Sequence, residues 1–386
     1  MMSPQPKTTP HHSDDLRHYD FIDALRGLAI LAVILVHASL AVPPSNTNLQ
    51  QLMAGGARGV QLFYIASALT LCLSWASRAP RERSPIRNFY LRRIFRIVPM
   101  FWIAIAVYVL LYGLAPRYYA PNGIQWYYAP LTALFLNGFH PETLTSVVPG
   151  GWSIVVEMTF YLVLPFLLRY VRSTTSLVML VVFSVLLERA TGYIFRGIYL
   201  PMYPPDQQYL VHDFVFLNFF GQFPVFAIGL LTYRMLRTDQ SWRMPVIVTA
   251  PVVFIGWLGW RAFTGHTLVS ALTLHVQMGA AFAWLAIVLA DRPTRVLVNP
   301  LTTWIGKRSY SMYLTHFAVL ELFAAIGVSR AFGSGNVTAV LHFATVVMAT
   351  AAVSWLCHLL IERPGIEAGR RLIERGEAQR AAALIH

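Results

Sequence analysis

The sequence predicts an all-α polytopic membrane protein, and three features indicate this fold class. Of the 386 residues, 56% are hydrophobic and only 12% are charged, whereas a soluble domain carries about 25% charged residues. Apolar runs of about 20 residues recur along the chain, and each is long enough to cross a hydrocarbon core of roughly 30 Å. The formal net charge is +13, and most basic residues lie between these runs rather than inside them.

Ten of the apolar runs are candidate transmembrane helices. They cover residues 21–42, 59–77, 97–115, 151–168, 174–195, 211–233, 245–263, 268–290, 310–328 and 337–360. A further run at 129–139 is too short to span and contains Pro130 and Asn137, so we expect a re-entrant or interfacial segment there. Because the first twenty residues are polar, we expect no cleaved signal peptide, and the first span should act as the insertion signal.

Basic residues in the loops predict the orientation of the chain, because cytoplasmic loops are enriched in Arg and Lys. An N-terminus inside the cell places most of the 30 basic residues, and both termini, on the cytoplasmic side. The arginines left outside are Arg58, Arg117, Arg189, Arg196, Arg261 and Arg330. The chain then divides into a polar cytoplasmic segment (1–20), a transmembrane domain (21–363) and a cytoplasmic tail (364–386). The tail is either an amphipathic helix on the inner membrane face or a frayed polar segment.

The first predicted span contains an arginine and a histidine. Arg26 and His37 are eleven residues apart, which places them on the same helix face and roughly 16 Å apart. Ionisable side chains inside a span usually face a cavity or a partner. Either the pair is functional, or Arg26 anchors the helix end and His37 is a hydrogen-bonded packing residue.

A carboxylate is predicted at the same depth as His37. Glu157 lies about six residues into the span that begins near Gly151, and this span enters from the outside. We therefore expect a pair in which Glu157 orients His37 and polarises it as a base. The alternative is a carboxylic acid that ties two helices together.

Basic and aromatic residues are also predicted at the inner end of the bundle. Arg92, Arg93 and Arg96 precede the third span, where they could clamp a phosphorylated ligand or could simply follow the positive-inside rule. His316 follows Tyr313 by one turn and is expected near the level of Arg26, either lining a ligand or packing. No histidine pair has metal-ligand spacing on one helix, so no metal is expected.

Taken in order, these motifs resemble acyltransferase family 3, integral membrane acyltransferases that modify sugars and other acceptors at the bacterial envelope. The motifs that carry the resemblance are Arg26 with His37, Arg92 to Pro99, Trp152 to Pro165, Ser309 to His316, and Glu362 to Pro364. The second span departs from the family pattern, since Ala68 stands where the family has glycine, although Ser67 is retained. The chain ends soon after the last motif, so we expect the type without a fused hydrolase-like domain.

The resemblance implies transfer of an acyl group, commonly acetyl, from cytoplasmic acyl-CoA to a hydroxyl of an envelope carbohydrate or similar acceptor. It implies that His37, supported by Glu157, deprotonates this hydroxyl or briefly holds the acyl group. By the same resemblance, the donor would be bound by Arg26, Arg93, Arg96, Tyr313 and His316, and the acceptor by Trp152, Ser153, Ser67 and Tyr161. The expected partners are acyl-CoA, the glycan and the lipid bilayer, with no metal and no nucleic acid, in a bacterial inner membrane.

An alternative from another class is a proton-coupled secondary transporter of a small polar solute, because ionisable residues within spans also line proton paths. Transporters commonly contain inverted repeats with broken helices at matching positions. No such repeat is visible in the sequence. From the sequence, the enzyme is the preferred hypothesis and the acceptor is open.

Overall fold

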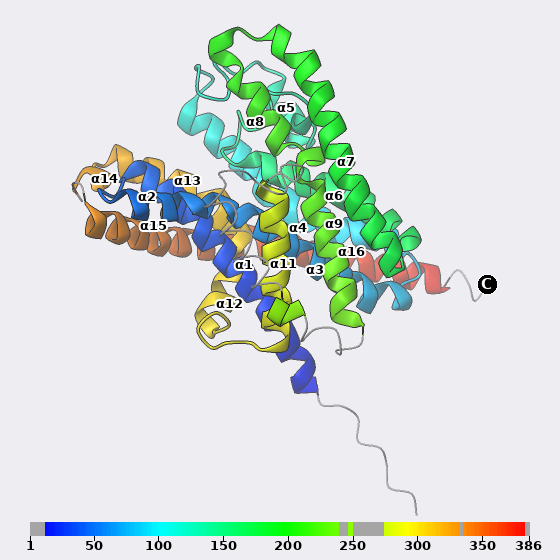
Figure 1. The fold of residues 1–386 in the computed structure, drawn as a ribbon. Helices are drawn as coiled ribbons and strands as arrows, with labels where there is room; N and C mark the ends of the chain where they lie inside the picture. Colours follow the sequence, from blue (N-terminus) through cyan, green and yellow to red (C-terminus); the bar gives the residue numbers. More distant parts are fainter. Residues whose placement is uncertain (1–11, 239–245, 250–273, 332, 334, 383–386) are drawn as a thin grey trace, which may run out of the picture.

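In the computed structural model, residues 12–238, 246–249, 274–331, 333 and 335–382 are described, and they confirm the all-α fold class (Figure 1). Within these residues, the one β-type pairing is an isolated bridge between Arg117 and Ala120. The helices are α1 (His12–Ala41), α2 (Thr47–Ala54), α3 (Gly59–Arg78), α4 (Pro85–Tyr112), α5 (Tyr128–Ala133), α6 (Gly151–Tyr170), α7 (Thr174–Tyr199), α8 (Tyr209–Leu217), α9 (Phe219–Arg237), α11 (Leu274–Asp291), α12 (Pro300–Lys307), α13 (Ser309–Ala325), α14 (Val328–Ala331), α15 (Asn336–Cys357) and α16 (Arg363–Ala382). A π-helical turn, His358–Glu362, joins α15 to α16.

Seven helical segments in the described part of the chain are long and apolar enough to cross a membrane. They are Asp20–Ala41, Thr47–Arg81, Pro85–Tyr112, Gly151–Tyr170, Thr174–Met202, Pro205–Arg237 and Asn336–Ala382, and each overlaps a predicted span. The predicted span at 310–328 forms the shorter helix α13, and the one at 268–290 overlaps the shorter apolar helix Val276–Asp291. The predicted span at 245–263 lies largely outside the described residues. Ten spans and cytoplasmic termini therefore stay predictions.

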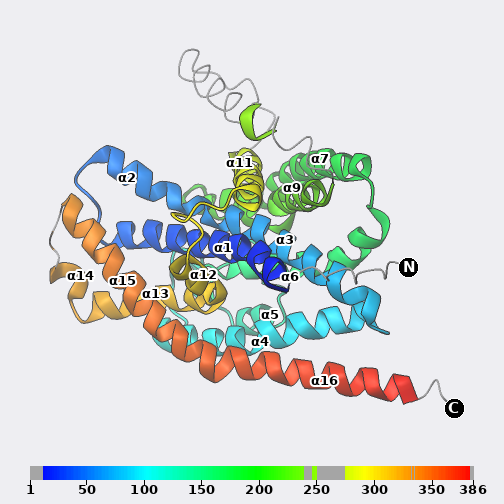
Figure 2. The same cartoon turned by 90° about the horizontal axis from the view of Figure 1, so that it is seen from below.

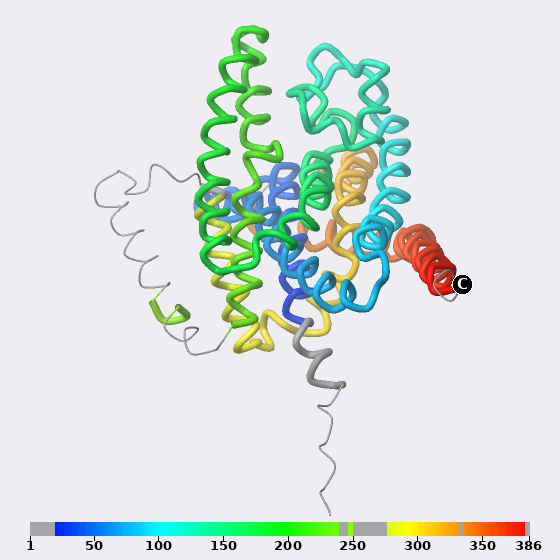
Figure 3. Tube along the Cα trace, turned by 90° about the vertical axis from the view of Figure 1, so that its right-hand side faces the viewer, coloured from blue at the N-terminus to red at the C-terminus, as the bar shows by residue number. Residues whose placement is uncertain are grey.

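Helix α1 lies at the centre of the bundle. It packs against α3, α12, α13 and α15, while α9 packs against α3, α7 and α11 (Figure 2). Figure 3 shows α7 and α9, both green, running side by side. Because α3 contacts both α1 and α9, it joins the two groups of helices into one core.

Two glycines allow the backbones of α1 and α12 to touch. A Cβ atom on Gly306 would overlap the carbonyl oxygen of Asp23, and one on Gly27 would overlap the carbonyl oxygen of Thr302. The side chain of Asn299 caps the start of α12 by accepting hydrogen bonds from backbone N–H groups of its first turn. Since α13 follows α12 directly, this contact positions α13 relative to α1.

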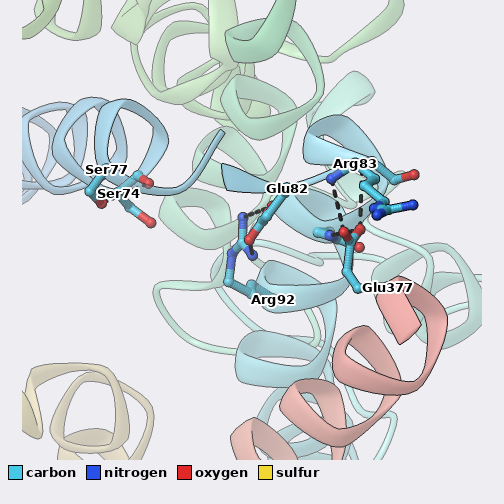
Figure 4. Close-up of polar contacts among 8 residues, drawn as sticks. Ser74, Ser77, Glu82, Arg83, Arg92 and Glu377 are labelled. Carbon is cyan, nitrogen blue, oxygen red and sulfur yellow. Dashed lines mark hydrogen bonds and ion pairs between the residues drawn. The ribbon is translucent and has the colours of Figure 1, made fainter. Parts of the chain in front are cut away.

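The predicted tail forms a helix, α16, which lies along α4 (Figure 2). The Glu377 carboxylate accepts hydrogen bonds from the backbone N–H groups of Arg83 and Ser84, at 2.8 and 3.2 Å, and from Asn88 Nδ2 at 2.8 Å (Figure 4). Backbone N–H groups at the start of a helix lack partners within it, so Glu377 caps α4 from another part of the chain. The helical alternative for the tail is therefore the observed one, and its place at the inner membrane face stays a prediction.

The short apolar run at 129–139 forms α5 and a 3-10 turn, Asn137–Phe139. Asn137 is buried, and hydrogen bonds offset the cost of burying its polar groups. Its Nδ2 donates to the carbonyl oxygen of Leu144 at 3.0 Å, and its backbone carbonyl oxygen accepts from Thr143 Oγ1 at 2.8 Å. The polar residue that interrupts the run thus closes a compact loop. Re-entry of this segment into the membrane stays a prediction.

Candidate active site

A small cavity at the Arg26 end of α1, called the inner cavity below, contains most of the predicted site residues. Its volume is about 40 Å³, enough for roughly three water molecules. The predicted residues that line it are Arg26, Ser67, Arg96, Ser153, Glu157, Tyr161 and Tyr313. Helices α1, α3, α4, α6 and α13 thus bring together residues that are far apart in the sequence.

Two hydroxyl groups hold Glu157 at the wall of the inner cavity. Its Oε1 accepts hydrogen bonds from Ser67 Oγ at 2.5 Å and from the Tyr161 hydroxyl at 2.6 Å. Tyr161 lies one turn after Glu157 on α6, whereas Ser67 reaches across from α3. The resemblance assigns Ser67 and Tyr161 to the acceptor, but the structure places both beside Glu157 and Arg26 in the inner cavity.

Three arginines surround the inner cavity with positive charge. Arg26 and Arg96 line it, and Arg93 is 8% exposed, with its Cζ 5.8 Å from the ring centroids of both Phe89 and Tyr161. The Nε atoms of Arg26 and Arg93 are buried and have no hydrogen-bond partner in the part of the chain that the structure describes. Because buried donors are normally paired, these guanidinium groups fit an anionic ligand.

Arg92 differs from its neighbours because an acidic residue already pairs with it. Arg92 Nη1 lies 2.5 Å from Glu82 Oε1, and Nη2 donates to Oε2 at 3.2 Å (Figure 4). A two-point Arg–carboxylate contact has well-defined geometry. Arg92 is therefore less available to a ligand than Arg93 or Arg96.

A larger cavity, called the outer cavity below, lies at the His37 end of α1. Its volume is about 430 Å³, within the usual range for small-molecule sites. Of the predicted site residues, His37, Trp152 and Tyr313 line it. Trp152 therefore lies on the side of His37, where an acceptor would be expected.

The aromatic rings beside His37 come from α13. Its ring centroid lies 5.4 Å from that of His316 and 4.4 Å from that of Phe317. His316 is fully buried, and its Nδ1 lies 2.7 Å from the carbonyl oxygen of Tyr313. Since a carbonyl can only accept, Nδ1 carries the hydrogen and Nε2 is an acceptor. This Nε2 has no hydrogen-bond partner in the described part of the chain, so it is free to interact with His37 or with a bound ligand.

The predicted pairing of Glu157 with His37 is wrong. Among the described residues, the two share no hydrogen bond, and they line different cavities. The prediction used depth along the span alone, whereas the rotation of α6 turns Glu157 toward Ser67 on α3. Helix α13 packs along α1 instead, and it brings His316, rather than Glu157, beside His37.

Tyr313 lines both cavities and lies between them. Its hydroxyl accepts a hydrogen bond from Ser153 Oγ at 2.7 Å and donates to the carbonyl oxygen of Gly150 at 3.0 Å. Gly150 has a φ of +72°, and a Cβ atom there would come within 2.9 Å of the Tyr313 hydroxyl, so a glycine is required on both grounds. We call the bonded side chains of Tyr313 and Ser153 the partition.

The comparison with known families identifies the family to which this chain belongs. The family model of an acyltransferase domain matches residues 19–359. The chain belongs to acyltransferase family 3. Its membership confirms the resemblance predicted from the motifs and favours an acyltransferase over a secondary transporter.

Relatives of this acyltransferase are similar at low identity. Peptidoglycan O-acetyltransferase OatA of Listeria monocytogenes is 24% identical over 346 residues, which cover 78% of this chain and 49% of OatA. The exopolysaccharide production protein ExoZ of Rhizobium meliloti is 25% identical over 344 residues, covering 85% of this chain and 95% of ExoZ. A protein of Staphylococcus aureus (strain COL), provisionally named an O-acetyltransferase, is 22% identical over 395 residues, covering 90% of this chain and 57% of the relative.

The chain therefore spans about half the length of the staphylococcal and listerial relatives and nearly all of ExoZ. No solved structure matches it.

The site of this family member includes one residue to which the sequence analysis assigned no role. Glu362 is 1% exposed, and its Oε2 accepts a hydrogen bond from Ser311 Oγ at 2.8 Å and lies 3.1 Å from His358 Nδ1. Its Oε1 lies 3.8 Å from Arg96 Nε. Glu362 thus holds Arg96 at the wall of the inner cavity. The signal in the sequence is the motif Glu362 to Pro364, which follows the last apolar run.

Proposed function

We propose that this acyltransferase moves an acetyl group from cytoplasmic acetyl-CoA to a hydroxyl of a cell-envelope carbohydrate in a bacterial inner membrane. The observation that carries the proposal is the pair of cavities along α1, with arginines at one and a histidine at the other. The name of OatA supports O-acetylation of a glycan, and the name of ExoZ supports a polysaccharide context.

The inner cavity suits the entry of the donor. Guanidinium groups bind phosphate through two parallel hydrogen bonds, and Arg93 and Arg96 provide such groups near the predicted cytoplasmic side. Arg26 lines the cavity itself, where its unpaired Nε could donate to a carbonyl oxygen of the pantetheine arm.

The outer cavity suits the acceptor and the reacting histidine. In the proposed reaction, the acceptor hydroxyl oxygen attacks the thioester carbonyl carbon, and the carbon–sulfur bond breaks as the ester bond forms. His37 takes the hydroxyl proton and returns it to the thiolate of CoA. In the alternative route, His37 first holds the acyl group and then passes it to the hydroxyl, with the same overall proton balance.

His316 and Glu157 have supporting roles in this proposal. His316 Nε2, an acceptor without a partner in the described part of the chain, is the atom that would accept a hydrogen bond from the nearby His37 ring and orient that imidazole. Glu157 instead offsets the charge of the arginines at the inner cavity. The pantetheine arm carries the thioester past the partition toward His37 when the contact between Tyr313 and Ser153 opens.

The test uses the purified full chain in detergent, radiolabelled acetyl-CoA, and envelope glycans extracted from a strain that lacks the gene. Wild-type protein should transfer label to glycan, and His37→Ala should abolish this transfer. Because His37 lines the outer cavity, His37→Ala should keep the thermal stabilisation caused by acetyl-CoA, which also shows that the variant is folded. Arg96→Ala should lose that stabilisation.

A matched histidine control is His212, which is exposed on α8 and lines neither cavity. His212→Ala should transfer label at the wild-type rate. Full transfer by His37→Ala would overturn the assigned centre. A wild-type protein that acetyl-CoA does not stabilise would overturn the assigned donor.

A further inference from the structure

Two arginines on the predicted outer side of the membrane line the same cavity. Extracytoplasmic loops are poor in arginine, and the predicted topology leaves only six arginines there. Arg58, in the 3-10 turn Gly55–Arg58, and Arg117, in the loop after α4, both line the outer cavity. The positive-inside rule therefore does not explain why Arg58 and Arg117 are there, and their role must be sought in the outer cavity itself.

Each of these guanidinium groups stacks on an aromatic ring instead of pairing with an acid. Arg58 Cζ lies 5.7 Å from the centroid of Phe216, and Arg117 Cζ lies 5.2 Å from that of Tyr112. Among the described residues, neither arginine forms an ion pair. None of the residues that line the outer cavity is Asp or Glu. The outer cavity thus holds two positive charges that no carboxylate of its own wall balances.

A purely structural role accounts for little of this arrangement. Arg117 Nη2 donates to the carbonyl oxygen of Gly113 at 2.6 Å, which uses one of its five N–H groups. The Arg58 side chain forms no hydrogen bond within the described part of the chain. Stacking on an aromatic ring fixes the plane of a guanidinium group while leaving its N–H edge open to a carboxylate or phosphate.

The rest of the cavity wall suits a sugar. Tyr118, Tyr119 and Trp152 supply aromatic surface, and Gln61 and Ser146 supply polar side chains. Aromatic rings with a few placed polar groups are a common lining for small-ligand sites. His37 lies in the same wall, so a sugar bound against these residues presents its hydroxyl groups near the reacting imidazole.

The geometry points to an acceptor that is an anionic carbohydrate, whose carboxylate or phosphate binds to Arg58 and Arg117 while a nearby hydroxyl faces His37. This inference rests on the proposed transfer reaction and names the class of acceptor. The anion orients the sugar, because a two-point contact with a guanidinium group fixes direction as well as position. The bonds made and broken are those of the proposed reaction, and the anion takes no part in them.

The experiment compares three preparations of glycan fragments from a strain that lacks the gene: native fragments, fragments whose carboxyl groups have been reduced to alcohols, and dephosphorylated fragments. Binding to the purified full chain is measured by thermal shift over a concentration series, without donor. We expect about tenfold weaker binding for whichever treatment removes the anion. Loss after carboxyl reduction identifies a uronate-type acceptor, and loss after dephosphorylation identifies a phosphorylated one.

Variants connect this preference to the two arginines. Arg58→Gln combined with Arg117→Gln should bind native and treated fragments equally, within about twofold. Arg196→Gln is the matched control, since Arg196 is an exposed arginine that lies outside this cavity, and it should keep the wild-type preference. Equal binding of all three preparations to wild-type protein, or an unchanged preference in the double variant, would overturn the inference.

Labelled acetyl-CoA separates this inference from the proposed function. Label that enters only neutral glycans would overturn the anionic acceptor and leave acetyl transfer standing. Conversely, arginine-dependent binding of native fragments without any transfer of label would leave the anion site standing and overturn the proposed reaction. Transfer to anionic glycans, with a raised acceptor KM in the double variant and unchanged stabilisation by acetyl-CoA, supports both.

Discussion

The contact between α1 and α12 can be tested by adding one methyl group. In Gly306→Ala, the new Cβ atom would overlap the carbonyl oxygen of Asp23 and lie 3.1 Å from the backbone nitrogen of Gly27. A flexible side chain could move aside, but a helix backbone cannot. The two helices would have to separate by roughly an ångström, and overpacking of this kind costs about 3 kcal/mol when the structure relaxes poorly.

The same displacement should impair function. Helix α1 carries Arg26 and His37, and α12 leads directly into α13 with Tyr313 and His316. A shift of about 1 Å between reacting groups can reduce a rate about 100-fold. Gly306→Ala should therefore melt below the wild-type temperature in detergent and should transfer acetyl groups at about one hundredth of the wild-type rate.

The matched control is Gly197→Ala on α7, because a Cβ atom at Gly197 meets no atom within 4 Å. Alanine in an open helical position should stabilise the protein by about 0.5 kcal/mol or leave it unchanged. A Gly306→Ala protein that melts and transfers like the wild type would refute the reasoning. It would mean that α1 and α12 tolerate separation without disturbing the site.

Three further predictions concern the inner cavity. Glu362→Gln should raise the KM for acetyl-CoA about tenfold with little change in kcat, because Arg96 loses its charged partner. The control is Glu367→Gln on the exposed face of α16, which should change neither KM nor kcat. Arg96→Gln should weaken the affinity for acetyl-CoA, measured by thermal-shift titration, at least about tenfold. Arg92→Gln removes a side chain that is already paired, so it should change this affinity less than about threefold. Equal effects of the two substitutions would contradict this difference. Tyr161→Phe should lower kcat/KM for acetyl-CoA about tenfold, since a hydrogen bond to a carboxylate contributes about 1.5 kcal/mol. If this variant showed wild-type steady-state kinetics, the Tyr161 hydroxyl would not be needed to position Glu157.

Position along a helix could be predicted from the sequence, but direction around it could not. Arg26 and His37 were predicted at opposite ends of one face, and the structure places one at each cavity. Glu157 was predicted at the depth of His37, but the face that α6 turns toward α1 depends on how its neighbours pack. Hydrophobicity is nearly uniform around a membrane helix, so no apolar stripe reveals that face.

Pairing between charged side chains was equally hidden. Arg92 and Arg93 are adjacent in the sequence, yet one binds Glu82 and the other stacks on aromatic rings. Neighbours on a helix point about 100° apart, so partners from other segments decide their roles. The two cavities could not be predicted at all, because each requires side chains from helices whose mutual packing is specified only in three dimensions.

The partition also bears on the energy supply of the cell. A protein with polar cavities reaching toward both faces of a membrane could short-circuit the electrochemical gradient, since each 100 mV is worth about 2.3 kcal/mol per charge. In this chain, the hydroxyl groups of Tyr313 and Ser153 meet between the inner and outer cavities with a contact of 2.7 Å. In the proposed reaction, the uncharged thioester end of the donor would fill the opening as it passes, which would leave no open path for a hydrated ion. Under the proposed function, moving only the uncharged end of the donor past the partition, while its phosphates stay at the inner cavity, would keep the membrane insulated during transfer.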